Sequence, residues 1–524
     1  MTAQFPPVLV GVAFAAIVVA LTAFGRRLPV PPPVLQVIAG VAIGFVPGVT
    51  VPELEPELVF FVFLPPILWA AAFFTSWREF KANRRPIGLL AIGLVVATTA
   101  AIAIVARALF PGMPWAVAVA LGAIVSPPDA VAATAVISRL PVPRRVVIVL
   151  EGESLVNDAS ALVLYRTAVA AAVTGAFSLG ESVVRFFIDA GIGIAIGIGV
   201  GWVLIAVAKR TQDALAETLL TFAGPYLAWV AAETFHVSAV LACVAGGLYT
   251  RQQFSTAVAP VSRVQSKAVW DMVIFVLNAL IFVLLGLQAT AVARERPTAE
   301  TLPLVWAGLV LGTVAMGLRL AWVPIATYLP RKLSAEIRRK DPLPPPKSVF
   351  LVAWTSMRGI VSLASALALP LVLADGSPFP FREEVLVVTM VVIVMTLLVQ
   401  GLTLSPLIKR FGFAPETAHH AEERLARREA IRRASEALEQ AAREPWAHDA
   451  DVQWLRAELR DRLRHHEDGG TRAAGRRRLR HRMQDAERRM LVRLRNEGAI
   501  SDEVMRELET ELDLEAMRLG VQAG

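Results

Sequence analysis

The sequence predicts an all-α protein that crosses a membrane about thirteen times and ends in a charged helical tail. Three observations predict this class: the composition, the length of the apolar segments, and the distribution of basic residues between them. Of the 524 residues, 55% are hydrophobic and only 18% are charged. The mean hydropathy of +0.57 lies far above the range of soluble globular domains. The composition therefore indicates an integral membrane protein.

The apolar segments give the number of spans. A helix needs about 20 predominantly apolar residues to cross a bilayer, and thirteen segments qualify, of which the ninth, residues 236–249, is the shortest. Their centres lie near Ala16, Ile38, Pro66, Val96, Val125, Ala159, Ile194, Ala223, Ala242, Asn278, Leu311, Ile360 and Val392. The first segment lacks the basic start of a signal peptide, so we expect it to remain as a spanning helix.

Basic residues alternate between the loops, which gives an orientation. One set of alternate loops holds 20 Lys and Arg residues and the other set holds five. Cytoplasmic loops are the basic ones. We therefore expect the N-terminus outside, the C-terminal tail in the cytoplasm, and the protein in the plasma membrane. Since the basic excess is in these loops, it does not indicate nucleic-acid binding.

The tail differs from the rest of the chain in charge. Residues 411–524 hold 22 of the 52 Lys and Arg residues, all of them Arg, and 23 of the 44 Asp and Glu residues. Leucines at helical spacing predict cytoplasmic helices there, so the domains are 1–410 in the membrane and 411–524 outside it. Solvated or self-packed helices are the simpler interpretation. A regulator that binds a nucleotide or a protein, or that senses pH through the histidines of the tail, stays open.

The span count suggests two inverted repeats of six helices separated by one helix. Corresponding elements are then seven helices apart, an arrangement common among secondary transporters. Matching breaks occur in the fifth and twelfth spans. The fifth contains Ser126, Pro127, Pro128 and Asp129, where the prolines remove backbone donors, and the twelfth contains Met357–Gly359.

Charged residues at mid-membrane depth indicate a functional site or a fixed ion pair, because a charge there costs several kcal/mol unless it is paired or hydrated. Asp158 lies about 20 Å along its helix from Arg145, and Asp129 and Arg358 are also central. Four-residue spacing places Ser154 beside Asp158. A carboxylate and a hydroxyl suit Na+ or a proton, and the stretch lacks the nitrogen and sulfur ligands that transition metals prefer. The alternative is a structural carboxylate bonded between helices.

Glu153 needs a partner, and we expect Arg358 to hold it. The planar guanidinium binds a carboxylate through two hydrogen bonds, which would tie the sixth helix to the twelfth. Arg319 lies nearer the end of its apolar segment, which favours packing or snorkelling.

Asp129 follows the proline break, where half-helices direct their positive ends into the core. Compensation of the helix dipoles, ion coordination, or both remain open for it. Asn157 is the neutral neighbour of Asp158. Glu151 either lines the cytoplasmic entrance or is solvated.

Four motifs together resemble the monovalent cation/proton antiporter-1 family, the bacterial NhaP-type sodium/proton exchangers. They are IVSPPDAVAATAV, EGESLVNDASALVLY, LNALIFVLLGLQ and WTSMRGIVSLASAL, and the similarity extends over roughly residues 5–410. The resemblance implies a dimer with a scaffold domain and a mobile core domain that moves the ion site. The family's site residues correspond here to Asn157 and Asp158, Asp129, Glu153 and Ser154, and Arg358.

Two positions depart from the family pattern. Ala70 stands where many relatives carry a carboxylate in the third helix, and Ala130 follows Asp129 where several relatives have proline. The first departure leaves the choice of ion open.

We therefore expect an antiporter, not an enzyme, that exchanges Na+ (or Li+) for H+ one for one at Asp158. K+/H+ exchange is the alternative, and a cation channel or membrane sensor is the remote one. The expected partners are monovalent cations, protons, the lipid bilayer and a second copy of the chain. No cofactor and no nucleic acid is expected.

Overall fold

The fold is given by a computed structural model, which is helical over nearly all of the residues that it describes. Those residues are 30–46, 56–137, 140–175, 179–211, 213–295, 297–373, 376–413, 417–467, 471–497 and short pieces between 499 and 512. Within them, a single bridge between Val372 and Pro378 is the β-structure recorded. The chain divides into two compact units, residues 1–415 and 416–524.

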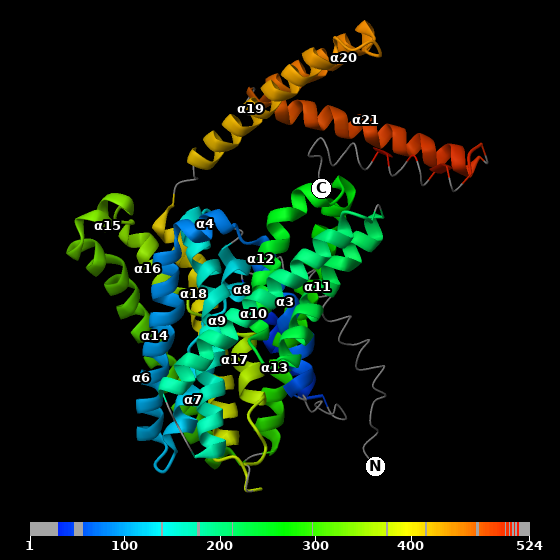
Figure 1. The fold of residues 1–524 in the computed structure, drawn as a ribbon. Coiled ribbons are helices and arrows are strands. Elements are labelled where there is room, and N and C mark those ends of the chain that lie inside the picture. Colours follow the sequence, from blue (N-terminus) through cyan, green and yellow to red (C-terminus); the bar gives the residue numbers. More distant parts are fainter. Residues whose placement is uncertain are drawn as a thin grey trace. The chain divides into compact units, whose positions relative to one another are not determined.

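The first unit is a bundle of long helices joined by short loops (Figure 1). Its elements are α2 (Pro32–Gly44), α3 (Pro56–Phe74), α4 (Trp77–Ala82), α5 (Arg84–Gly88), the π-helix η1 (Leu89–Leu94), α6 (Val95–Leu109), α7 (Trp115–Val125), α8 (Ala130–Ile137), α9 (Arg144–Thr174), α10 (Leu179–Ala208), α11 (Ala214–Thr234), α12 (Ala239–Ala257), α13 (Pro260–Glu295), α14 (Thr298–Leu333), α15 (Ala335–Lys340), α16 (Pro346–Trp354), α17 (Ile360–Leu367) and α18 (Arg382–Phe411).

These helices follow the predicted second to thirteenth spans in order. Six of the described stretches are long and apolar enough to cross a membrane, and α2, α7 and the Phe60–Phe74 part of α3 are shorter apolar helices. The α9 helix is 31 residues long and carries the charges of the EGESLVND stretch. The first predicted span, around Ala16, lies outside the described residues.

Both predicted helix breaks are present. The fifth span consists of α7 and α8, with Ser126–Asp129 outside the helices, and the twelfth consists of α16 and α17, with residues 355–359 outside them. In Figure 1, α8 and α16 lie in the half of the bundle that contains α4 and α15, while α7 and α17 lie in the other half. Four half-helix ends therefore meet near the middle of the bundle.

Close helix packing brings the third, eighth and ninth spans together around Trp69, which is 1% exposed. A β-carbon added at Gly246 or Gly224 would lie 2.5 or 2.7 Å from the Trp69 ring. The two glycines therefore make room for the indole between α3, α11 and α12, because any larger residue would overlap it.

The second unit contains the tail helices α19 (Thr417–Ala441), α20 (Asp449–Glu467) and α21 (Thr471–Asn496). Arg456 of α20 donates two hydrogen bonds to the Glu439 carboxylate of α19, at 2.6 and 2.7 Å. Arg432 pairs with Glu429 and Glu436 within α19. Mixed charge at helical spacing thus forms solvent-exposed helices, as the sequence indicated.

Candidate functional site

The two helix breaks cross and are bonded to each other. The Asp129 amide donates to the Met357 carbonyl at 2.6 Å, and the Arg358 Nε donates to the Val125 carbonyl at 3.0 Å. A β-carbon at Gly359 would lie 1.8 Å from Asp129 Oδ2. Glycine at this position therefore allows the Asp129 carboxylate to lie directly against the second break.

The charges at the crossing match the ends of the half-helices. Arg358 binds the carbonyl of Val125, the last residue of α7, and helix C-termini carry partial negative charge. Asp129 immediately precedes α8 and lies against Gly359, the residue before α17, so that its carboxylate is beside two positive helix ends. Dipole compensation is therefore one role that the geometry gives Asp129.

The Arg358 side chain is 2% exposed and its partners come from the backbone and from hydroxyl groups. Its Nη1 donates to both the carbonyl and the hydroxyl oxygen of Ser356, and its backbone amide donates to Thr396 Oγ1 at 3.1 Å. The guanidinium thus donates hydrogen bonds to carbonyl groups that have no helical partner where the helices are interrupted.

Glu153 is paired with Arg319 of α14, so the expected ion pair with Arg358 was wrong. Arg319 Nη2 donates to Glu153 Oε2 at 2.8 Å, and Nη1 donates to Oε1. Both side chains are 1% exposed. Arg319 also donates to the Val352 carbonyl of α16, at 3.1 and 3.3 Å. The two hydrogen bonds from Arg319 to Glu153 therefore link α14 to α9, whereas the sequence had predicted a link between α9 and the second break.

The reason for the error is the length of α14. This helix has 36 residues, and Arg319 lies 14 residues before its last residue, which is about 21 Å along the axis. Arg319 is therefore deep in the bundle, although it is close to the end of the apolar segment in the sequence. The sequence did contain a signal for this pair, because Arg319 would be energetically costly inside an apolar segment unless an acidic residue neutralised it.

Asn157 holds the first break in place. Its side chain is fully buried, and its Nδ2 donates to the Pro128 carbonyl at 2.9 Å. Its Oδ1 accepts no hydrogen bond from the described residues. Ser126 bonds back to the Ala123 carbonyl at 3.1 Å, which is the local bonding that hydroxyls often make in membrane helices. Asn157 thus contacts the break from α9, and Ser126 joins the break to the end of α7.

A small cavity of about 40 Å³ brings together three of the predicted ion-binding residues. Asp158, Ser154 and Asp129 line it, together with Gly359 and Ser362. A single water needs about 10–15 Å³ by this kind of measure, so the cavity has room for a small cation with a little water. Asn157 is not among the lining residues, because its amide is directed to Pro128.

The third span forms an apolar wall of this cavity. Its lining residues are Leu64, Ile67, Leu68 and Ala71. Ala70, the position at which the sequence departs from many relatives, is 4% exposed and packs in the core. The α3 side chains that line the cavity therefore contribute no oxygen ligand.

Polar residues that the sequence reasoning missed also support the site. Ser362 lines the cavity, and its hydroxyl has no hydrogen-bond partner among the described residues. Gln400 Oε1 accepts from the Ser356 amide at 3.1 Å. Thr396 and Gln400 are buried and four residues apart on α18. That spacing in an apolar helix was the available signal, since it places both residues on one face.

Comparisons with known proteins agree with this geometry. The family described as sodium/hydrogen exchanger, transmembrane, matches residues 13–410. An uncharacterized Na+/H+ exchanger of Mycobacterium tuberculosis is 35% identical, over 97% of this chain and 95% of that one. A sodium, potassium, lithium and rubidium/H+ antiporter of Bacillus pumilus is 33% identical, over 74% of this chain and 59% of that one.

A solved structure has the same fold. It is the sodium proton antiporter MjNhaP1 from Methanocaldococcus jannaschii at pH 8, with a TM-score of 0.56 and 18% identity, over 76% of this chain and 96% of that one. With the family match over most of the membrane unit, the bundle with two crossed breaks identifies a multi-pass cation/proton antiporter and not an enzyme. The chain belongs to the sodium/hydrogen exchanger family.

Proposed function

We propose that this antiporter exchanges Na+ (or Li+) for H+, one for one, at the small cavity that contains Asp158. One observation carries the proposal: Asp158, Ser154 and Asp129 line the same small cavity at the crossing of the two breaks. Carboxylate and hydroxyl oxygens are suitable ligands for a hard cation. The proton and the metal ion compete, because both bind the Asp158 carboxylate.

The charges gathered around the crossing support a one-for-one exchange. Asp129, Glu153 and Asp158 carry three negative charges when ionised, and Arg319 and Arg358 carry two positive charges. The empty site then has a net charge of −1, and either one Na+ or one proton brings it to zero. A neutral loaded site crosses the membrane at lower cost than a charged one, whichever ion occupies it.

K+/H+ exchange by the same site is the second candidate. The Bacillus pumilus relative is described as an antiporter of sodium, potassium, lithium and rubidium. In addition, the α3 wall adds no oxygen ligand to the cavity. A site with few fixed oxygen ligands discriminates less strongly among monovalent cations, because coordination number and cavity rigidity set the selectivity.

We propose that the N-terminus is outside the cell, that the tail is in the cytoplasm, and that the working form in the plasma membrane is a homodimer. The 20-to-5 distribution of bases between alternate loops supports the orientation. The family resemblance supports the dimer.

Proteoliposomes containing a pH-sensitive dye test the function. We expect Na+ and Li+ added to the outside, in separate assays, to release protons from the lumen, with K+ giving a smaller response. Clamping the membrane potential at different values should leave the Na+-driven rate unchanged. A rate that follows the potential would contradict one-for-one exchange, and a larger response to K+ than to Na+ would favour the second candidate.

A further inference from the structure

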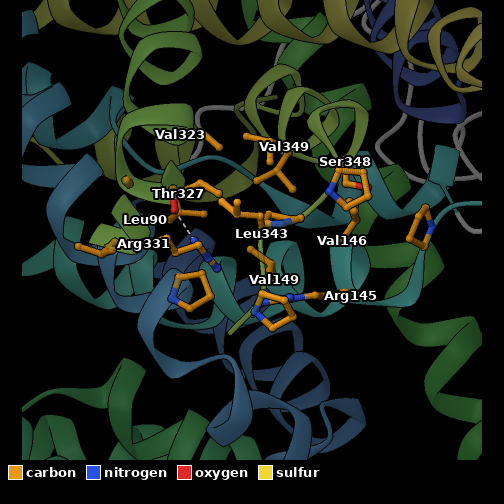
Figure 2. A pocket seen from close by; sticks show the side chains of 18 residues that line it. Leu90, Arg145, Val146, Val149, Val323, Thr327, Arg331, Leu343, Ser348 and Val349 are labelled. Atoms are coloured by element: carbon orange, nitrogen blue, oxygen red, sulfur yellow. Dashed lines mark hydrogen bonds between the residues drawn. The ribbon is translucent and has the colours of Figure 1, made fainter. Parts of the chain in front are cut away.

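A second, larger cavity of about 360 Å³ lies among η1, α9, α14 and α16 (Figure 2). Its walls are mostly valine, leucine and proline side chains, and the loop of residues 342–345 closes one side. Arg145 and Arg331 are the charged residues among its lining residues, and Figure 2 shows both at the cavity. Binding sites for small molecules occupy about 300–1,000 Å³ and combine apolar walls with a few polar groups.

This cavity is separate from the ion site. The two cavities share no lining residue. Val149 and Asp158 are nine positions apart on α9, which is a rotation of about 180° at 3.6 residues per turn. The larger cavity therefore lies on the opposite face of α9 from the proposed ion-binding carboxylate.

Positive charge is in excess at one side of the cavity. The Asp341 carboxylate pairs with both Arg145 and Arg331. Arg85 immediately precedes Pro86, which lines the cavity, and its buried Nη2 has no hydrogen-bond partner among the described residues. The two guanidinium groups that line the cavity thus share one carboxylate, and the buried Arg85 donor without an acceptor is costly. A further anion would balance this charge and accept from Arg85.

We propose that the cavity binds an anionic membrane amphiphile. The acyl chain occupies the apolar part beside Val149, Val323 and Val349, and the carboxylate or phosphate head lies against Arg85, Arg145 and Arg331. Apolar burial binds the chain, and charge-assisted hydrogen bonds fix the head. The guanidinium groups come from three separate segments, so a bound head also links those segments.

The bound amphiphile would act on the structure next to the ion site. Val352 lines the cavity, and its carbonyl accepts two hydrogen bonds from Arg319, the partner of Glu153. Val323 is one helical turn from Arg319 on the same helix. Occupation of the cavity therefore stabilises the arrangement of α9, α14 and α16 in which Glu153 is paired.

Thermal unfolding of the delipidated full-length protein in a non-ionic detergent tests the proposal without depending on transport. The probes are oleate, dioleoylphosphatidylglycerol, oleyl alcohol and inorganic phosphate. We expect a saturable rise in Tm with oleate or the anionic phospholipid, and little change with oleyl alcohol or phosphate. Comparison of the first two probes shows whether a free fatty acid or a phospholipid is the source of the ligand.

Three variants locate the binding. Val149→Trp fills the cavity and should abolish the rise in Tm. Arg145→Gln, at a half-exposed position, should raise the half-saturating concentration by at least about tenfold, the lower end of what one hydrogen bond to a charged group contributes. Arg338→Gln removes an exposed charge of α15 and should leave binding unchanged.

The outcomes are decisive in both directions. If Arg145→Gln and Val149→Trp respond to oleate and phosphatidylglycerol as the parent does, the assignment of this cavity is overturned. Equal stabilisation by oleyl alcohol would overturn the role of the guanidinium groups, and stabilisation by phosphate alone would overturn the role of the acyl chain. If Val149→Trp does not fold, the comparison of Arg145→Gln with Arg338→Gln still shows whether the ligand binds at this cavity.

Discussion

Two faces of α9 use the same chemical group in opposite ways. On one face, the Asp158 carboxylate lines a small cavity with Ser154. On another face, only five residues away, the Glu153 carboxylate is held by both Nη atoms of Arg319 and is 1% exposed. A carboxylate with two charge-assisted hydrogen bonds is not readily available to a transported ion. With Asp158 as the proposed ion ligand, the comparison indicates that the partner of a carboxylate, and not its depth, distinguishes a structural role from a transport role.

The largest expected effect is at Asp158. Asp158→Asn keeps the size of the side chain but removes the charge that a proton or Na+ neutralises, so we expect exchange to fall to the background of empty vesicles. The measurement is Na+-driven dye response in proteoliposomes. The variant should elute from size-exclusion chromatography as the parent does, and retained exchange would refute the assignment of Asp158.

The next effect tests the crossing. Gly359→Ala places a β-carbon 1.8 Å from Asp129 Oδ2, so either the Asp129 side chain must leave its place or the two breaks must separate, and we expect at least a tenfold lower exchange rate. Gly317→Ala in α14 is the matched control, because a β-carbon there meets no atom within 4 Å. Similar rates in the two variants would contradict the close crossing.

At the Glu153 face of α9, removal of one member of the ion pair should lower the stability of the protein more than its transport activity. Glu153→Gln leaves the Arg319 cation buried without its carboxylate, which costs about 3–5 kcal/mol. Unfolding in detergent should show a lower Tm, with a smaller loss in the double variant Glu153→Gln/Arg319→Met. The exposed pair of Lys267 and Asp271 is the control, since Asp271→Asn should cost about 0–1 kcal/mol. A larger loss in the double variant than in the single one would argue against the pair.

The smallest effect is expected in the tail. Hydrogen bonds from Arg456 lower the pKa of the exposed Glu439 carboxyl group. The contribution of this pair to stability is therefore present above the ordinary pKa of Glu and is lost as the pH falls through the lowered value. Arg456→Gln should slightly increase amide exchange in α19 and α20 at neutral pH, and this difference should disappear in acid. An equal difference at both pH values would show that the ion pair is not its cause.

Much of the fold and part of the site followed from local sequence. The apolar lengths predicted the order of the spans, and Pro127 and Pro128 predicted the first break because proline removes a backbone donor. Helical spacing placed Ser154 beside Asp158, and both line the same cavity. These features depend on neighbours along the chain.

The features that could not be predicted depend on how helices far apart in sequence are rotated and tilted. The partner of Glu153 is decided by the position of Arg319 along a 36-residue helix, which apolar length alone does not give. In the same way, Asn157 is adjacent to Asp158 in sequence but donates to Pro128, because residues next to each other on a helix point about 100° apart.

The apolar wall of the ion cavity has a mechanical consequence. Hydrogen bonds join the two breaks to each other and to α9, and such directional bonds oppose relative displacement of those segments. The facing wall of Leu64, Ile67, Leu68 and Ala71 makes contacts that have no directional preference. These four side chains therefore make no directional bond to the joined segments, so that a relative displacement of the two would break no hydrogen bond at this wall.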